Sequence, residues 1–184
     1  YEISECLVGS EMCIETVAFL YTTGPYPLSY NGWGDVLVIV FFGFVPVGGT
    51  YYVQALTWTS DTTVASLICG LLIDTLLVVN NYRDREADAR SGKRTVIVRF
   101  GEKFGRYLYL MLGVAASLLC FWFFFEGHLF AALLPLLYLI PHVLTWRRMV
   151  QIHSGKKLNS ILGETSRNML LMGILLSIGF LIRH

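Results

Sequence analysis

The stretch NNYRDREADARSGKRT, residues 80–95, follows directly on a long apolar run and decides how the rest of the chain is interpreted. It places Asp84 and Asp88 four residues apart and then adds Lys93 and Arg94. Ionisable groups that belong to a membrane-spanning helix are costly and usually functional. Two carboxylates at this spacing can hold a divalent cation, and the basic residues after them can bind phosphate. The stretch therefore predicts a diphosphate site at a membrane surface.

A helical continuation of the apolar run gathers the polar side chains on one face. At 100° per residue, Asn81, Asp84 and Asp88 fall within about 80° of Asp74. We expect this face to line a cavity, with Asp84 and Asp88 as catalytic residues and ligands of Mg²⁺. Asp74 and Asn81 are expected to bind substrate, although a buried polar partner would explain Asp74 equally well.

The basic residues of the stretch have two interpretations. Arg83, Lys93 and Arg94 are expected to neutralise a leaving diphosphate, because a guanidinium offers two parallel donors to phosphate oxygens. The alternative is a solvated loop in which the arginines only neutralise neighbouring carboxylates.

Composition predicts a membrane protein. Of the 184 residues 55% are hydrophobic and 15% are charged, against about 25% charged in soluble domains. About 20 apolar residues span a bilayer as a helix. We therefore predict an all-α, multi-span transmembrane helix bundle of five spans, preceded by an apolar stub before Tyr21. Apart from Asp74, the spans rest on runs without Asp, Glu, Lys or Arg at 36–60, 62–82, 107–125, 129–146 and 168–182.

The basic residues are unevenly distributed. Eight of the 14 lie at 83–106 and five at 147–167, whereas the loops at 56–61 and 126–128 carry none. Two spans separate the two basic regions, so both fall on one side of the lipid bilayer. Because cytoplasmic loops carry an excess of Lys and Arg, the Asp-rich loop is predicted to be cytoplasmic.

The two ends of the chain receive different interpretations. Residues 1–14 show no helical period and are predicted to be a non-native sequence artefact, with a natural polar terminus as the alternative. Residues 15–184 are predicted to form part of a transmembrane domain, the C-terminal fragment of a longer protein.

Several glycines and prolines predict local features. Pro46 is expected to kink its span, and Gly43, Gly48 and Gly49 are expected to permit close helix packing. Gly101 is expected to break the chain before the next span.

The loop at 22–35 is rich in Gly, Pro and Tyr, so its Tyr26 either sits at the membrane interface or binds an acceptor. His128, His142 and His153 are interpreted as isolated residues at the membrane interface and not as catalytic groups. No nucleic-acid-binding module is found, so nucleic acid is not expected as a partner.

Residues 80–88 and 92–95, followed by VRFG at 98–101, resemble the second Asp-rich motif of the UbiA superfamily of intramembrane prenyltransferases. The segments YTTGPYPL at 21–28, FFG at 41–43 and GTYYVQ at 49–54 favour the branch that acts on 1,4-dihydroxy-2-naphthoate in menaquinone biosynthesis. The 4-hydroxybenzoate branch usually carries a basic pair in the Pro-containing loop, and this chain has none there.

The resemblance implies nine transmembrane helices around a central cavity, in which two Asp-rich motifs bind magnesium and polyprenyl diphosphate. Ionisation gives an allylic carbocation, which the naphthoate ring attacks with loss of its carboxylate, giving demethylmenaquinone. The second motif corresponds to Asp84 and Asp88, and no first motif is present. The chain alone is therefore expected to be inactive, and the whole protein to reside in the inner (plasma) membrane.

Other functions remain open from the sequence. Alternative acceptors for a prenyltransferase of this kind are 4-hydroxybenzoate and homogentisate. A transporter in which Asp74 and Asp84 line an ion path, and a non-catalytic isoprenoid-binding subunit, are alternatives of a different class.

Overall fold

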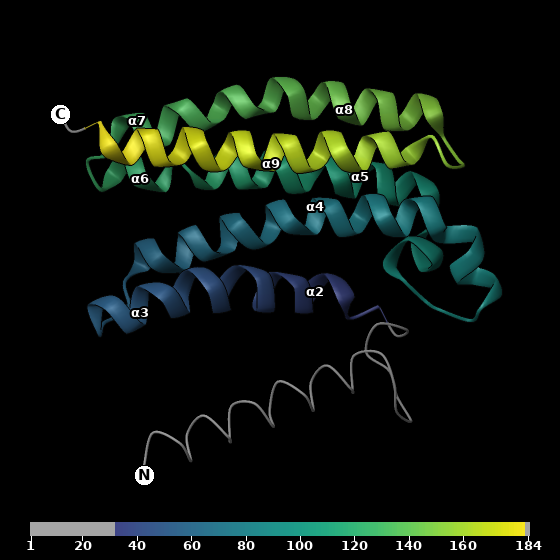
Figure 1. Ribbon diagram of the computed structural model, residues 1–184, viewed down its shortest axis with the longest axis horizontal. Coiled ribbons are helices and arrows are strands. Elements are labelled where there is room, and N and C mark those ends of the chain that lie inside the picture. The colour runs from purple at the N-terminus through teal and green to yellow at the C-terminus, as the bar shows by residue number, and fades with distance from the viewer. Residues whose placement is uncertain (1–31, 183–184) are drawn as a thin grey trace, which may run out of the picture.

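The computed structural model describes residues 32–182, and every regular element in that range is a helix. The first span combines α2 (Gly34–Val38), the π-helical segment η2 (Ile39–Gly48) and α3 (Gly49–Ala55). The long helix α4 (Ser60–Arg90) runs back alongside it (Figure 1).

The second part of the bundle begins with α5 (Val96–Leu119) and the short α6 (Trp122–Phe125). A further span comprises α7 (Leu129–Leu133), the 3-10 segment η3 (Leu134–Tyr138) and α8 (Leu139–Ile152). The helix α9 (Leu158–Leu181) completes the described part.

The five predicted spans are confirmed. Five helices of the described chain are long and apolar enough to cross a membrane, with lengths of 22 to 31 residues. They are longer than the uncharged runs, because a helix keeps its backbone hydrogen bonds after its side chains become charged. The apolar stub predicted before Tyr21 lies outside the described residues.

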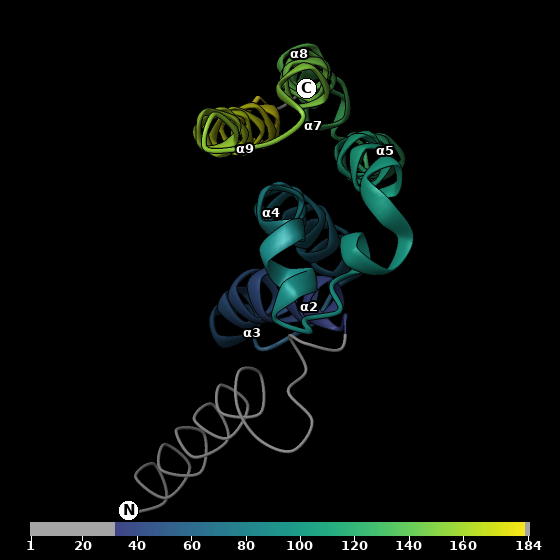
Figure 2. The ribbon, with the colours of Figure 1, turned by 90° about the vertical axis from the view of Figure 1, so that its right-hand side faces the viewer.

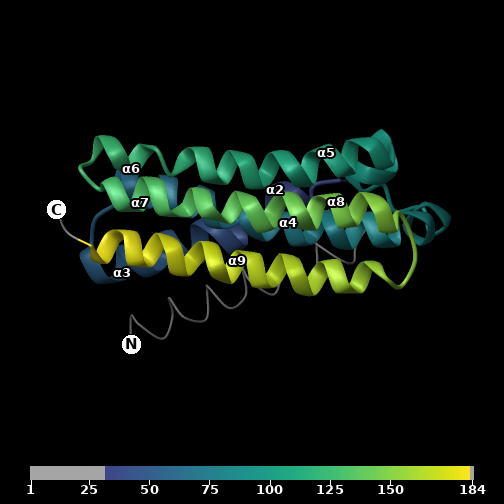
Figure 3. The same ribbon diagram turned by 90° about the horizontal axis from the view of Figure 1, so that it is seen from above.

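Helix α4 lies at the centre of the arrangement. Seen along the helices it is surrounded by the α2–α3 span, α5 and α9, and α8 lies farther out (Figure 2). It packs most extensively against η2 and α5 and also against α9. The view from above shows all spans running nearly parallel to one axis (Figure 3). A displacement of α4 would therefore disturb three interfaces at once.

The contact between η2 and α4 depends on glycine. A Cβ atom added to Gly43 would lie 2.8 Å from the Gly70 Cα, and one added to Gly70 would lie 2.9 Å from the Ile39 Cα. Close backbone approach of this kind is a usual means of packing helices in membranes. Gly48 packs against a tryptophan ring, whereas a Cβ at Gly49 would meet no described residue within 4 Å, so the packing role of Gly49 stays a prediction.

Pro46 and Gly101 mark the two irregular positions predicted. Pro46 lies inside the π-helical segment η2, where it cannot donate a helical hydrogen bond. Gly101 adopts φ 87° and ψ 169° inside α5 and interrupts that helix, as predicted. This φ lies in the region that glycine tolerates best.

Two buried apolar clusters hold the spans together. The first lies at the end of the bundle that carries the Asp-rich stretch and comprises Val78, Val79, Tyr82, Ile97, Tyr109, Leu112, Met149, Leu158 and Ile161. The second lies towards the opposite end and comprises Ile68, Leu72, Ala116, Cys120, Phe123, Ala131, Tyr138 and Met172. Many other large apolar side chains point outward, including Val53 (72% exposed) and Leu170 (66% exposed). Such surfaces suit contact with lipid.

Substitution of Gly70 by Ala is expected to destabilise the protein by about 1–3 kcal/mol, because the added methyl group meets the backbone of η2. The matched control is Gly163→Ala in α9, where a Cβ would meet nothing within 4 Å. That substitution is expected to be neutral or to stabilise by up to about 1 kcal/mol. Thermal unfolding in detergent measures both, and equal midpoints for the two variants would contradict the packing.

Candidate functional site

Helix α4 is defined by clear signals at both ends. The Thr59 hydroxyl oxygen accepts a hydrogen bond of 3.2 Å from the Thr62 N–H and caps the first turn. At the other end the Ser91 N–H donates to the Ala87 carbonyl at 3.0 Å. Gly92 then turns the chain with φ 78°. No break occurs between these ends, so the helix extends eight residues past Tyr82, as the predicted polar face requires.

The four polar residues of that face differ in exposure. Asp74 and Asn81 are buried, at 2% and 5% exposed. The Asp88 side chain is 13% exposed and the Asp84 side chain 40%. The face therefore runs from the core of the bundle to its surface, with the carboxylate pair at the accessible end.

Arg83 engages the Asp84 carboxylate with two donors. Its Nε lies 2.8 Å from Asp84 Oδ1 and its Nη2 lies 2.6 Å from Oδ2. The same guanidinium donates to Asn80 Oδ1 at 2.7 Å and to Asn159 Oδ1 at 3.0 Å. Because Asn159 belongs to α9, Arg83 links the carboxylate to a second span. The local ion pair considered from the sequence is thus present in this structure.

Lys93 returns to Asp88 through the turn at Gly92. Its Nζ lies 3.6 Å from Asp88 Oδ1, and its backbone N–H donates to the Asp88 carbonyl at 2.9 Å. The second oxygen, Asp88 Oδ2, is buried and accepts no hydrogen bond. Asp88 therefore retains a free acceptor, whereas both oxygens of Asp84 are occupied.

Two predicted site residues are not brought into this arrangement. Arg94 is exposed and its side chain forms no ion pair with a described residue. Tyr26 lies outside the described residues.

Asp74 faces the α2–η2 span. Gly70, one turn earlier on α4, packs against Ile39, and Asp35 lies one turn before Ile39. The Asp35 carboxyl interacts electrostatically with that of Asp74, so the two repel when both are ionised. Each has a buried Oδ1 without a hydrogen-bond partner. Unpartnered buried carboxyl oxygens are unfavourable, so a hydrogen-bond donor or a cation placed between these two carboxyls would be stabilised.

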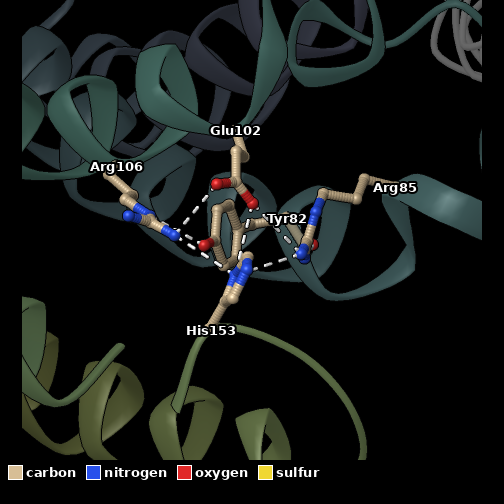
Figure 4. A network of polar contacts seen from close by, with 5 residues as sticks. All are labelled: Tyr82, Arg85, Glu102, Arg106 and His153. Carbon is tan, nitrogen blue, oxygen red and sulfur yellow. Dashed lines mark hydrogen bonds and ion pairs between the residues drawn. The ribbon is translucent and has the colours of Figure 1, made fainter. Parts of the chain in front are cut away.

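A five-residue network joins α4, α5 and the loop after α8 beside the carboxylates (Figure 4). Glu102 accepts from Arg85 at 3.3 Å and from Arg106 at 3.2 Å. Arg106 Nε donates to the Tyr82 hydroxyl at 2.9 Å, and Arg85 lies 4.5 Å above the Tyr82 ring. His153 Nδ1 lies 3.2 Å from both Arg106 Nη2 and Glu102 Oε2.

This network fixes the α4 extension against α5 and the loop after α8. His153 adopts φ 63°, a backbone conformation that residues other than glycine rarely adopt. The contacts of the network must therefore stabilise this conformation. The interpretation of the histidines as isolated is wrong for His153. It is also wrong for His142, which is buried, 2.9 Å from the Tyr138 hydroxyl and stacked on Tyr109.

Comparison with known proteins identifies the family. The model of the "UbiA prenyltransferase family" matches residues 10–179. The chain belongs to this family. The resemblance predicted from the Asp-rich stretch is thereby confirmed, and with five spanning helices the chain is a multi-pass membrane protein.

Two individual relatives within the family carry the same name. This UbiA chain is 39% identical over 173 residues to the 1,4-dihydroxy-2-naphthoate octaprenyltransferase of Haemophilus influenzae, covering 90% of the chain and 54% of that relative. It is 41% identical over 103 residues to the Escherichia coli protein of the same name, covering 56% of the chain and 33% of that relative. The chain spans about half the length of the first relative, and a smaller part of the second. No solved structure matches it.

The carboxylates of this UbiA chain are of the chemical kind that can bind Mg²⁺. Mg²⁺ is usually bound by one or two carboxylates together with waters and substrate phosphates. Asp88 Oδ2 is a buried oxygen without a partner, and Asp84 offers a second carboxylate one turn away once it parts from Arg83. No three His, Cys, Asp or Glu side chains of the described residues come together to hold a metal ion. Further ligands would have to come from substrate and water or from outside the described residues.

The network around Glu102 yields a prediction. Glu102→Gln removes the one negative charge that faces Arg85, Arg106 and His153. The α4–α5 connection should loosen, so amide hydrogen exchange at residues 84–101 is expected to accelerate by about tenfold. The control is Glu86→Gln, an exposed neighbour without a described ion pair, which should leave exchange unchanged. Identical exchange in both variants would show that the network does not hold the extension.

Proposed function

We propose that this chain is part of a membrane prenyltransferase that transfers a polyprenyl group from polyprenyl diphosphate to 1,4-dihydroxy-2-naphthoate. The observation that carries the proposal is the carboxylate pair Asp84 and Asp88 at the accessible end of a buried membrane helix, with Arg83 and Lys93 in contact. Charges of both signs in one place suit a substrate that combines a metal cation with a diphosphate. The names of the relatives support the choice of substrates.

Asp84 and Asp88 are proposed to hold Mg²⁺ beside the diphosphate. Bound there, Mg²⁺ neutralises charge that develops on the leaving group. In this structure Arg83 and Lys93 neutralise the two carboxylates. Binding of magnesium and diphosphate would therefore exchange partners: the carboxylates would bind Mg²⁺, and the Arg83 and Lys93 side chains would bind phosphate oxygens. Arg94, which has no ion pair with a described residue, needs no such exchange.

An apolar cavity offers a place for the polyprenyl chain. It has a volume of about 760 Å³, lies between α4 and α9, and is lined by side chains such as Ile68, Leu72, Met172 and Ile178. Its nearest α4 residue, Ile73, lies 11 residues before Asp84, or about 16 Å along the helix. A chain in this cavity would extend into the bilayer from a diphosphate held at the surface.

The acceptor is proposed to contact Asp74 and Asn81, with Tyr26 as a further contact. The unpartnered oxygens of Asp74 and Asp35 can accept hydrogen bonds from the two ring hydroxyls of a dihydroxynaphthoate. In the reaction, the ring carbon that bears the carboxylate forms a bond to C1 of the prenyl group. The bond from C1 to the diphosphate oxygen breaks, and the carboxylate leaves as carbon dioxide, so atoms and electrons balance.

The proposal also covers the location of the protein in the cell and the activity of the 184-residue chain on its own. The placement of 13 of the 14 basic residues supports a cytoplasmic position for the Asp84 end in an inner (plasma) membrane. Ionisation of an allylic diphosphate requires charge stabilisation from several directions. The described residues provide it from one side only, so we expect the 184-residue chain alone to be inactive.

The test is prenyl transfer by the complete gene product in lipid, with polyprenyl diphosphate, dihydroxynaphthoate and magnesium. Asp84→Asn and Asp88→Asn each keep the side-chain size but remove a negative charge, so each should lower the rate by at least about 100-fold. The matched control is again Glu86→Gln, which lies between the two on an exposed face and should stay within twofold of wild type.

Two results would contradict the proposal. Activity within twofold of wild type in both aspartate variants would remove the carboxylates from the reaction. Faster transfer to 4-hydroxybenzoate or homogentisate than to dihydroxynaphthoate would keep the enzyme class but change the acceptor.

A further inference from the structure

A second, polar cavity lies between α8 and α9. Its volume is about 400 Å³, and its lining includes the three arginines Arg147, Arg148 and Arg167 together with a single acidic residue, Glu164. It is separate from the carboxylate pair of α4 and from the apolar cavity between α4 and α9, because the three share no lining residue.

The negative charge of Glu164 is neutralised by Arg148, another residue that lines the cavity. Its carboxylate pairs with Arg148 Nη1 at 2.5 Å and accepts from the Thr145 hydroxyl at 3.4 Å. Asn168 in turn donates to the Thr145 hydroxyl at 2.9 Å. Three arginines against one glutamate leave two positive charges in excess. Arg147 and Arg167 carry that excess, since both are exposed and neither pairs with a described residue.

These two arginines lie within membrane-spanning helices and not in the connecting loop. Arg147 is five residues before the end of α8 at Ile152, about 8 Å along the helix, and Arg167 is nine residues after Leu158, about 14 Å. Arg147 directly follows the uncharged run at 129–146, and Arg167 directly precedes the uncharged run at 168–182. Both therefore mark the edge of the hydrocarbon core, where a guanidinium without a described ion-pair partner favours an anionic group at the membrane interface.

An apolar stripe continues the cavity along η3 and α8. Leu137, Ile140 and Leu144 recur every three or four residues, and each is more than half exposed. They lie farther from the loop end than Arg147, so they are deeper in the bilayer. Phosphate-binding groups near the surface above an apolar stripe match the layout of a phospholipid.

We propose that the α8–α9 cavity binds the phosphodiester head group of an anionic phospholipid. Arg147 and Arg167 hold the phosphate, and an acyl chain lies along Leu137, Ile140 and Leu144. Basic pockets between transmembrane helices are known to hold anionic head groups. The site does not depend on the proposed prenyl transfer.

The test measures lipid binding to the complete gene product by native mass spectrometry in detergent. The probes are palmitoyl-oleoyl phosphatidylglycerol and the phosphatidylcholine with the same acyl chains. The wild type should retain phosphatidylglycerol in preference. Each arginine near the surface contributes about fivefold, so Arg147→Gln with Arg167→Gln should weaken phosphatidylglycerol binding by about 25-fold. The pair Lys156→Gln and Lys157→Gln, in the loop outside the cavity, is the charge-matched control and should change binding by less than twofold.

Three results would overturn the proposal. The first is unchanged phosphatidylglycerol binding in the arginine double variant, or in both single variants if the double variant does not fold. The second is equal retention of the two lipids by the wild type. The third is displacement of phosphatidylglycerol by millimolar inorganic diphosphate in an Arg147-dependent manner, which would assign the cavity to a free phosphate compound.

Discussion

The structure depends on one requirement: α4 has to remain a single unbroken helix from the bilayer core to its charged C-terminal end. In hydrocarbon every backbone N–H and C=O needs a partner, so a span cannot loosen before it reaches water. The helix meets this requirement over 31 residues, from the cap at Thr59 to the turn at Gly92. The close contact of Gly43 and Gly70, and the packing of α5 and α9, then fix its position.

The charged end of α4 is neutralised by its own neighbours. Arg83 covers Asp84, Lys93 approaches Asp88, and Glu102 balances the arginines of the adjoining network. Such pairing lowers the cost of holding many charges beside a membrane. It also means that a ligand carrying both a cation and phosphates can replace each internal pair without leaving a charge unpaired. Asp88 Oδ2 is the exception, because it has no hydrogen-bond partner. It is therefore the atom that most directly indicates where a ligand could bind.

Much of the fold followed from the sequence because local chemistry determines it. Long uncharged runs located all five spans, and Gly101 marked the break in α5. The helical spacing of Asp74, Asn81, Asp84 and Asp88 anticipated their common face. The network of Tyr82, Glu102 and His153 was missed because its members lie far apart in the sequence and depend on how the spans pack. The proximity of Asp35 to Asp74, close enough for the two carboxyls to interact electrostatically, was missed for the same reason.

The rigid continuation of α4 from the membrane core to the carboxylates is tested most directly by spin labels at Thr63→Cys and Ala89→Cys. Both positions are exposed on that helix, and the labels are placed in a background without other cysteines. Pulsed electron-spin distance measurement should give one narrow distribution, because 26 residues of α-helix separate the two Cα atoms by about 39 Å. A broad distribution, or one centred well below this distance, would show that the helix ends before Asp84 and would contradict the account.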